Sequence, residues 1–181
     1  METQKKANPA PLGLLGFGMT TILLNLHNAN IINLTIVVIA MGIALGGIAQ
    51  IIAGILEFKH GNTFGGTAFS AYGLFWISLV FIWTNKNNPM QDSISMGFYL
   101  LLWGIFTVFM FIGTLKHNTI SKIVFGSLAI LFILLSVGDF AENHAITKIA
   151  GYVGLFCGLS AVYSAVGQIV NEEFGKKILP L

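Results

Sequence analysis

The sequence lacks arginine altogether, has one cysteine and carries few charges of either sign. Without arginine, no guanidinium is available for bidentate recognition of phosphate. The single Cys157 excludes an intrachain disulfide and a metal cluster built on cysteines. Only 9% of the 181 residues are charged, whereas a typical soluble domain has about 25%. The net charge of +2 also gives no reason to expect nucleic acid as a partner.

Long apolar runs take the place of the missing charges. Hydrophobic residues make up 55% of the chain, and the mean hydropathy is +0.83. Six runs are long and apolar enough to cross a bilayer, and backbone in hydrocarbon must satisfy its own hydrogen bonds, so each run is read as a helix. The sequence thus predicts an all-α integral membrane protein with a tail over 1–9, a six-helix domain over 10–171 and a second tail over 172–181. The predicted spans are 10–27, 34–57, 65–84, 94–115, 120–138 and 146–170.

The lysines predict which side of the membrane each loop faces. With six spans, seven of the nine lysines fall on one side, in the two tails, after the second span, and around the loop between the fourth and fifth. Lys86 and Lys148 fall on the other side. Because short cytoplasmic loops collect Lys and Arg, both termini are expected in the cytoplasm.

Small residues recur at four-residue spacing in two of the predicted spans. Gly42 and Gly46 form one such pair, and Gly154 and Gly158 form another. Such pairs let helix backbones approach closely. Two interpretations remain open, namely packing within one helix bundle and packing between subunits.

Ionisable side chains avoid the middle of every predicted span. Glu57 and His27, for example, lie at span ends. This argues against a dedicated buried proton carrier, which usually requires a carboxylate or histidine at depth. The same absence leads us to expect no metal, no cofactor and no enzymatic active site.

Neutral polar residues, by contrast, do occur at depth. In the first span, Thr20 and Thr21 share a helical face with Phe17, and Asn25 lies further along. In the third, Ser and Thr residues line one face, and Phe69, Tyr72 and Trp76 lie nearly opposite; only one face can meet a given cavity. Any single Ser or Thr in a membrane helix is more often bonded to its own backbone than to a ligand.

The stretch NPAPLGLLGFGMTT begins the first span. Proline is tolerated in the first turn of a helix, and Asn8 before Pro9 is a suitable N-cap. The resulting helix is short, rich in glycine and interrupted by polar residues, which suits the lining of a cavity better than contact with lipid. Its N-terminus favours an anion. The alternative interpretation is a stiff helix start with no further role.

The sequence resembles the acetate uptake transporter family nearly from end to end. The most specific blocks are the opening NPAPLGL and the motif GNTFG-x-TAF-x-x-YG-x-FW, which runs here from Gly61 to Trp76. The resemblance implies a six-helix protomer with cytoplasmic termini that assembles into a homohexamer in the cytoplasmic (inner) membrane. It also implies that each protomer passes acetate, and often succinate, across that membrane.

The resemblance further implies roles for individual residues. It implies a hydrophobic constriction of Phe17, Tyr72 and Leu128, with Leu131 as the competing choice for the leucine. The aromatic face of the third span then points inward. Ala161 matches a position that helps to set substrate size. The expected pathway also includes Thr20, Thr21, Asn25, Gln50 and Trp76, while Asn8, Pro9, Pro11, Glu57 and Asn62 belong to the matching motifs.

The expected function is therefore passage of small carboxylates, by a channel or in a proton-linked manner. Neutral hydroxyls and amides can replace part of the hydration of acetate, and a dry aromatic ring would resist hydrated inorganic ions. A channel for small neutral molecules such as ammonia fits the missing charges equally well, and a non-transporting scaffold is a third possibility. Membrane lipid and further copies of the chain are the expected partners.

Overall fold

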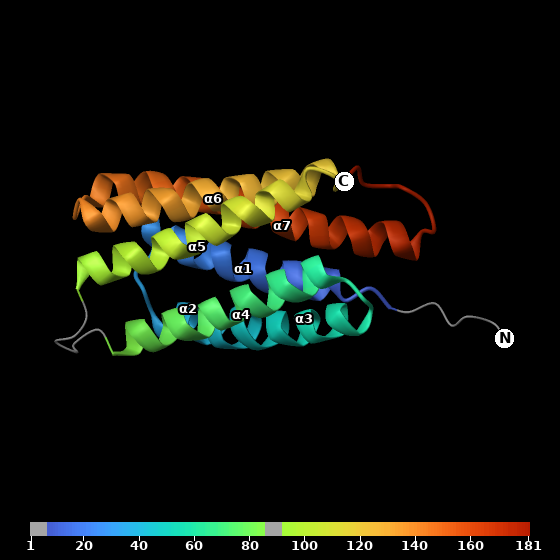
Figure 1. The fold of residues 1–181 in the computed structure, drawn as a ribbon, viewed down its shortest axis with the longest axis horizontal. Coiled ribbons are helices and arrows are strands. Elements are labelled where there is room, and N and C mark those ends of the chain that lie inside the picture. Colours follow the sequence, from blue (N-terminus) through green and yellow to red (C-terminus); the bar gives the residue numbers. More distant parts are fainter. Residues whose placement is uncertain (1–6, 86–91) are drawn as a thin grey trace.

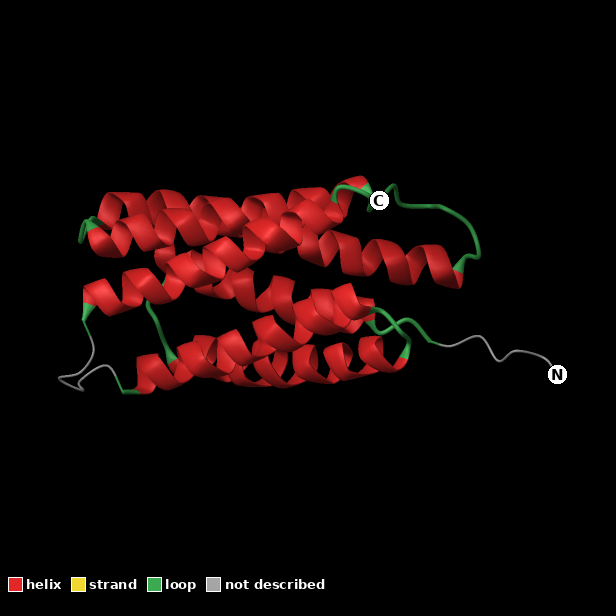
Figure 2. Ribbon diagram, viewed as in Figure 1, coloured by secondary structure: helices red, strands yellow, loops and turns green. Residues whose placement is uncertain are grey.

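The computed structural model describes residues 7–85 and 92–181, and it is all-helical over them (Figure 2). Six helical spans are long and apolar enough to cross a membrane, as the sequence predicts. Five of them are single helices, and the second span is divided into three parts. The single helices are α1 (Ala10–Asn28), α4 (Thr63–Thr84), α5 (Ser93–Thr114), α6 (Thr119–Phe140) and α7 (His144–Glu173). The divided span consists of α2 (Ile36–Met41), η1 (Gly42–Ala49) and α3 (Gln50–Lys59).

Side-chain caps fix where α4 to α7 begin. Asn62, Asp92, Asn118 and Asn143 each accept a hydrogen bond from a backbone N–H in the first turn of the helix that follows. Because these caps satisfy otherwise orphaned donors, each helix begins one or two residues before the predicted apolar run. The last helix also continues three residues past its predicted end, to Glu173.

The start of α1 differs in detail from the prediction. Pro9, not Asn8, occupies the N-cap position, and its backbone is already near-helical, with φ −82° and ψ −14°. The Asn8 side chain reaches past Pro9, and its Oδ1 accepts the N–H of Ala10 at 3.0 Å. Asn8 therefore caps α1 from the position before the N-cap residue. Pro11 lies in the first turn, where no N–H is required.

The second span contains an eight-residue π-helix, η1, which the sequence reading did not anticipate. Such segments are rare and occur mostly as single turns within α-helices, often at functional sites. The glycines of η1 allow close packing on α4: a Cβ on Gly42 would lie 2.8 Å from Val80, and one on Gly46 would lie 2.7 Å from Trp76. The Gly42–Gly46 pair thus packs within the protomer.

The helices enclose an interior in which α1 has the central place (Figure 1). α1 packs most extensively on α7, and also contacts η1, α3, α2 and α4. α7 in turn packs on α6, and α6 packs on α5. On the other side of α1, α3 packs on α4. Gly158 of α7 and Gly18 of α1 face each other, since a Cβ on either would lie 2.8 Å from the carbonyl oxygen of the other. The second predicted glycine pair therefore also packs within the protomer.

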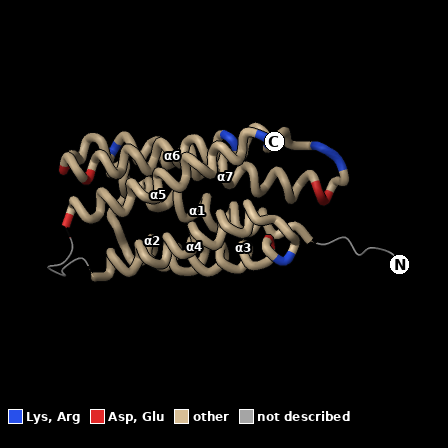
Figure 3. Tube along the Cα trace, in the orientation of Figure 1, with Lys and Arg blue, Asp and Glu red and all other residues tan. Residues whose placement is uncertain are grey.

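Charge and exposure divide the surface as expected for a membrane protein. Large apolar side chains point outward on α4 and α5, where Phe81, Leu102 and Phe109 are each 68% exposed. Charged residues gather at the two ends of the bundle, and most of the lysines drawn lie at the end where α1 begins and α7 ends (Figure 3). Lys148, in the second turn of α7, belongs to the opposite end. Lys5, Lys6 and Lys86, which also entered the topology prediction, lie outside the described residues.

Candidate transport pathway

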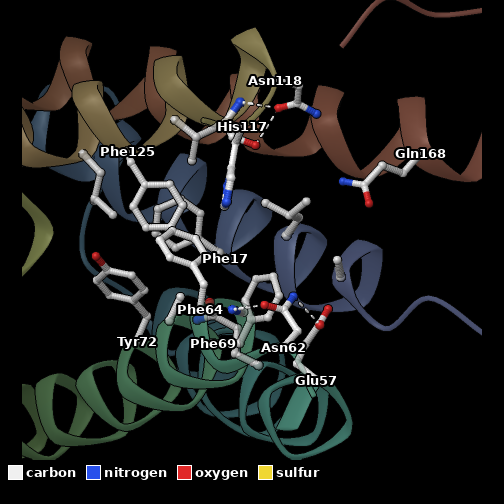
Figure 4. Close-up of a pocket in the computed structure, with 18 residues that line it drawn as sticks. Phe17, Glu57, Asn62, Phe64, Phe69, Tyr72, His117, Asn118, Phe125 and Gln168 are labelled. Atoms are coloured by element: carbon white, nitrogen blue, oxygen red, sulfur yellow. Dashed lines mark hydrogen bonds between the residues drawn. The ribbon is translucent and has the colours of Figure 1, made fainter. Parts of the chain in front are cut away.

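A cavity of about 370 Å³ opens at the end of the bundle where α1, α4 and α6 begin and α3 and α7 end. Five helices contribute residues to its wall, namely α1, α3, α4, α6 and α7, so the cavity lies within the bundle. Polar side chains line its outer part, and aromatic and aliphatic side chains line its inner part (Figure 4). The lining residues are Ala10, Leu14, Phe17, Gln50, Glu57, Asn62, Phe64, Gly65, Ala68, Phe69, Tyr72, His117, Asn118, Ser121, Val124, Phe125, Leu128 and Gln168.

The outer part of the cavity links the two ends of the chain. The Asn8 side-chain amide donates to Oε1 of Gln168 at 2.9 Å, which ties the start of α1 to α7. On the other side of the mouth, His117 contacts the Phe64 ring edge-on, with centroids 4.8 Å apart. Sequence reasoning did not name His117 or Gln168 as site residues, although both are polar residues close to predicted span ends.

Glu57 lines the cavity and is buried, with 4% of its surface exposed. Its Oε2 accepts a hydrogen bond from Nδ2 of Asn62 at 2.7 Å, while Oδ1 of Asn62 accepts the N–H of Gly65 at 3.0 Å and caps α4. The sequence correctly places Glu57 near the end of its span, but gives no sign that the carboxylate is buried there. The two motif residues therefore act together at the mouth, where they join α3 to the start of α4.

The predicted constriction residues meet at the inner end of the cavity. Phe17, Tyr72 and Leu128 all line it and are all buried, and the Phe17 and Tyr72 rings lie 6.1 Å apart. Tyr72 is also surrounded by Trp103, Phe106 and Phe125, with ring centroids between 5.6 and 6.3 Å away. Leu131, the alternative to Leu128, is buried but is not part of the cavity wall.

The Tyr72 hydroxyl is held by a chain of hydrogen bonds that the sequence does not reveal. It lies 2.9 Å from Oγ1 of Thr107, and the Thr107 hydroxyl donates to the carbonyl oxygen of Trp103 at 2.7 Å. Since Thr107 has only one hydroxyl hydrogen, Tyr72 is the donor in the first bond. Tyr72 therefore presents its ring, with no free polar hydrogen, to the interior.

The remaining predicted pathway residues divide into two groups. Gln50 lines the cavity, and its Nε2 donates to the carbonyl oxygen of Gly46 at 2.7 Å. The others are buried further along the bundle and are not part of the cavity wall; these are Thr20, Thr21, Asn25, Trp76 and Ala161. Within the third span, Tyr72 and Trp76 are buried and Leu74 is exposed, so the aromatic face points inward.

Several buried polar side chains donate hydrogen bonds to the backbone of their own helix. The sequence had left open whether such residues bond to the backbone or face a ligand. The Thr20 hydroxyl donates to the carbonyl oxygen of Gly16 at 2.7 Å, and Asn25 donates to that of Thr21 at 2.8 Å. Thr21 and Trp76 do not follow this pattern. Among the described residues, Oγ1 of Thr21 and Nε1 of Trp76 are the buried side-chain nitrogen and oxygen atoms without a hydrogen-bond partner.

Comparison with known proteins places this architecture in a family. The chain is 54% identical to the succinate-acetate/proton symporter SatP of Escherichia coli strain K12, over 184 aligned residues that cover all of this chain and 98% of the relative. It is 38% identical to ammonia transport outward protein 2 of Saccharomyces cerevisiae, over 93% of this chain and 64% of that protein. A solved structure of the bacterial acetate channel SatP matches with a TM-score of 0.96 and 54% identity, and the match covers 98% of this chain and 99% of that one. The family model described as GPR1/FUN34/yaaH matches residues 1–178, and the chain belongs to that family.

Proposed function

We propose that this protein passes acetate, and also succinate, across the cytoplasmic membrane through a pathway in each protomer. The cavity at the lysine-rich end is the entrance on one side, and Phe17, Tyr72 and Leu128 form the constriction midway. Gln50 lies before the constriction, and Thr20, Thr21, Asn25, Trp76 and Ala161 line the continuation beyond it. No enzymatic step is involved.

The observation that carries the proposal is the change in chemistry along the cavity. The mouth presents several amides, the Ser121 hydroxyl, His117 and Glu57, whereas Phe17, Tyr72 and Leu128 line the inner end together with the Gln50 amide (Figure 4). A dry apolar constriction opposes hydrated inorganic ions by dewetting. Acetate, with a methyl group and a single carboxylate, can exchange water for the polar groups on one side and present its methyl to the ring faces.

Orientation, localisation and assembly follow from the same proposal. Both termini face the cytoplasm, because the lysine-rich end is the one from which they emerge. The tails are 1–9 and 172–181, and the second folds back on α7, where the Asn171 side chain bonds the backbone of Ile178 and Leu179. The outward apolar faces of α4 and α5 meet membrane lipid and neighbouring copies in a homohexamer.

Uptake of labelled acetate into proteoliposomes tests the function. We expect flux above that of protein-free liposomes, inhibited by unlabelled succinate. Repeating the assay with and without an imposed pH gradient separates the two modes, since an inward proton gradient drives a proton-linked carrier and is not coupled to flux through a channel. Acetate flux equal to that of protein-free liposomes would reject the proposal.

Ammonia is the second candidate substrate, because one relative in the family is named as an outward ammonia transporter. The same neutral constriction suits an uncharged molecule. Stopped-flow measurement of internal pH after an ammonium pulse distinguishes the candidates in the same vesicles. Accelerated ammonia entry without acetate flux would favour the second candidate over the first.

A further inference from the structure

Buried polar atoms without partners are costly, so each one in a folded protein calls for an explanation. Here the two such atoms among the described residues are Oγ1 of Thr21 and Nε1 of Trp76. Only about 2% of either residue is exposed. Each atom carries a polar hydrogen, and the indole N–H can only donate.

These two residues occupy equivalent places relative to the constriction. Thr21 follows Phe17 by four residues on α1, and Trp76 follows Tyr72 by four residues on α4. α1 and α4 both begin at the cavity mouth and therefore run in the same direction. Thr21 and Trp76 are thus each about 6 Å, or one helical turn, beyond the proposed constriction residue of their helix and on the same helical face.

The indole of Trp76 also reaches α1 at this level. A Cβ on Gly46 of η1 would lie 2.7 Å from Cγ of Trp76 and 2.9 Å from Cγ2 of Thr20, so both side chains converge on that glycine. Thr20 directly precedes Thr21, and the two donors therefore lie in the same layer of the bundle.

Two neighbouring hydroxyls do not compete for this role, because their hydrogens are already engaged. The Tyr72 hydroxyl donates to Thr107, and the Thr20 hydroxyl donates to the carbonyl oxygen of Gly16. A carboxylate that leaves the cavity therefore meets no free hydroxyl at the constriction and reaches two free donors in the next turn.

From these relationships we propose a carboxylate-binding subsite formed by Thr21 Oγ1–H and Trp76 Nε1–H, one turn beyond the constriction. This inference rests on the proposed function and specifies where the substrate anion is held. The cavity wall stops at Phe17 and Tyr72 and includes neither donor, so the carboxylate reaches them when the two rings part. Both donors are neutral, which lets the anion bind without being trapped by a fixed charge.

Transport kinetics provide the first test. In proteoliposomes, Thr21→Val and Trp76→Phe should each raise the half-saturating acetate concentration roughly tenfold or more, since a hydrogen bond to a charged group is lost. Thr114→Val and Trp83→Phe are the matched controls; the buried Thr114 hydroxyl is engaged with the carbonyl oxygen of Phe111. Both controls should stay within twofold of the wild type. If both test variants fold and keep the half-saturating acetate concentration of the wild type, the proposed subsite is wrong.

A second measurement titrates the wild-type sequence, and variants serve only to assign its resonances. The chain has three tryptophans, and 5-fluorotryptophan labelling gives one ¹⁹F resonance for each. Removing Trp83 or Trp103 in turn assigns them. Titration with sodium acetate should shift the Trp76 resonance, and sodium chloride at equal ionic strength should not.

The outcomes separate the two levels of the proposal. A Trp76 resonance unmoved by acetate, in a protein that transports acetate, would overturn the subsite and leave the function intact. Absence of acetate flux in the wild type would instead remove the proposed function.

Discussion

The hydroxyl of Tyr72 is hydrogen-bonded to Oγ1 of Thr107 on α5 at 2.9 Å, and this bond ties the wall of the cavity to a helix that does not line it. The backbones of α4 and α5 are seldom close, and side chains bridge the two helices instead: the Tyr72 ring packs on Trp103 and Phe106, and the Ser78 hydroxyl lies 2.7 Å from that of Tyr99. The bond and the surrounding rings together hold the orientation of the Tyr72 ring at the inner end of the cavity.

Replacing Thr107 by Val should destabilise the protein by about 1–3 kcal/mol, because the Tyr72 hydroxyl would remain buried without an acceptor. The midpoint of thermal unfolding in detergent reports the change. Adding Tyr72→Phe to Thr107→Val should recover much of the loss, since both partners are then removed. A double variant less stable than Thr107→Val alone would show that the bond is not the source of the effect.

Leu128 and Leu131 should differ in their effect on substrate size. Leu128→Ala should raise the ratio of butyrate to acetate uptake, because a side chain is shortened at the inner end of the cavity. Leu131→Ala is the matched control, as Leu131 is equally buried but is not part of the cavity wall. Proteoliposome uptake with the two labelled acids measures the ratio, and an effect of Leu131→Ala alone would reassign the leucine.

Gly158→Ala should push α7 away from α1, because the added methyl group would clash with the α1 backbone. The added Cβ would lie 2.8 Å from the carbonyl oxygen of Gly18 and 2.9 Å from the backbone nitrogen of Ile22, and neither can move without its helix. We expect a loss of about 1–3 kcal/mol in thermal stability. Gly104→Ala is the control, since its Cβ would find its nearest neighbour at 3.4 Å. It should be neutral or slightly stabilising, because alanine favours the helix.

Asn62 has two separable roles at the cavity mouth. Asn62→Ala removes both the cap on α4 and the bond to Glu57, and should cost about 1–2 kcal/mol. Asn62→Asp keeps a cap acceptor but cannot donate to Glu57 and brings two carboxylates together. If the bond to Glu57 matters, Asn62→Asp should be destabilised at neutral pH and regain stability when Glu57→Gln is added. Equal stability of Asn62→Asp and the wild type would leave only the capping role.

The sequence predicted the spans well because the bilayer imposes a length and a composition on each helix. It placed the helix starts less well, because Asn118 and Asn143 extend their helices by side-chain hydrogen bonds, which hydropathy does not detect. The π-helix over Gly42–Ala49 was not foreseen, because a glycine-rich apolar run is compatible with either helical form.

The site was predictable to the extent that it lies in distinctive motifs. Phe17 and Tyr72 were found in this way, and the structure brings both to the cavity. Thr107, which holds Tyr72, lies 35 residues further along the chain, and no local pattern connects the two. The burial of Glu57 likewise depends on α4 folding back over it, which hydropathy does not register.

The close pairing of α1 with α7 has a consequence for biosynthesis. The ribosome produces α1 first and its principal neighbour last, at rates of about 5–20 residues per second. Until α7 emerges, Gly18 and Asn25 have no helix to pack against, and the circuit around the cavity stays open. A chain interrupted anywhere before α7 therefore lacks the main neighbour of α1 and one side of the cavity wall, so the final helix completes the protomer.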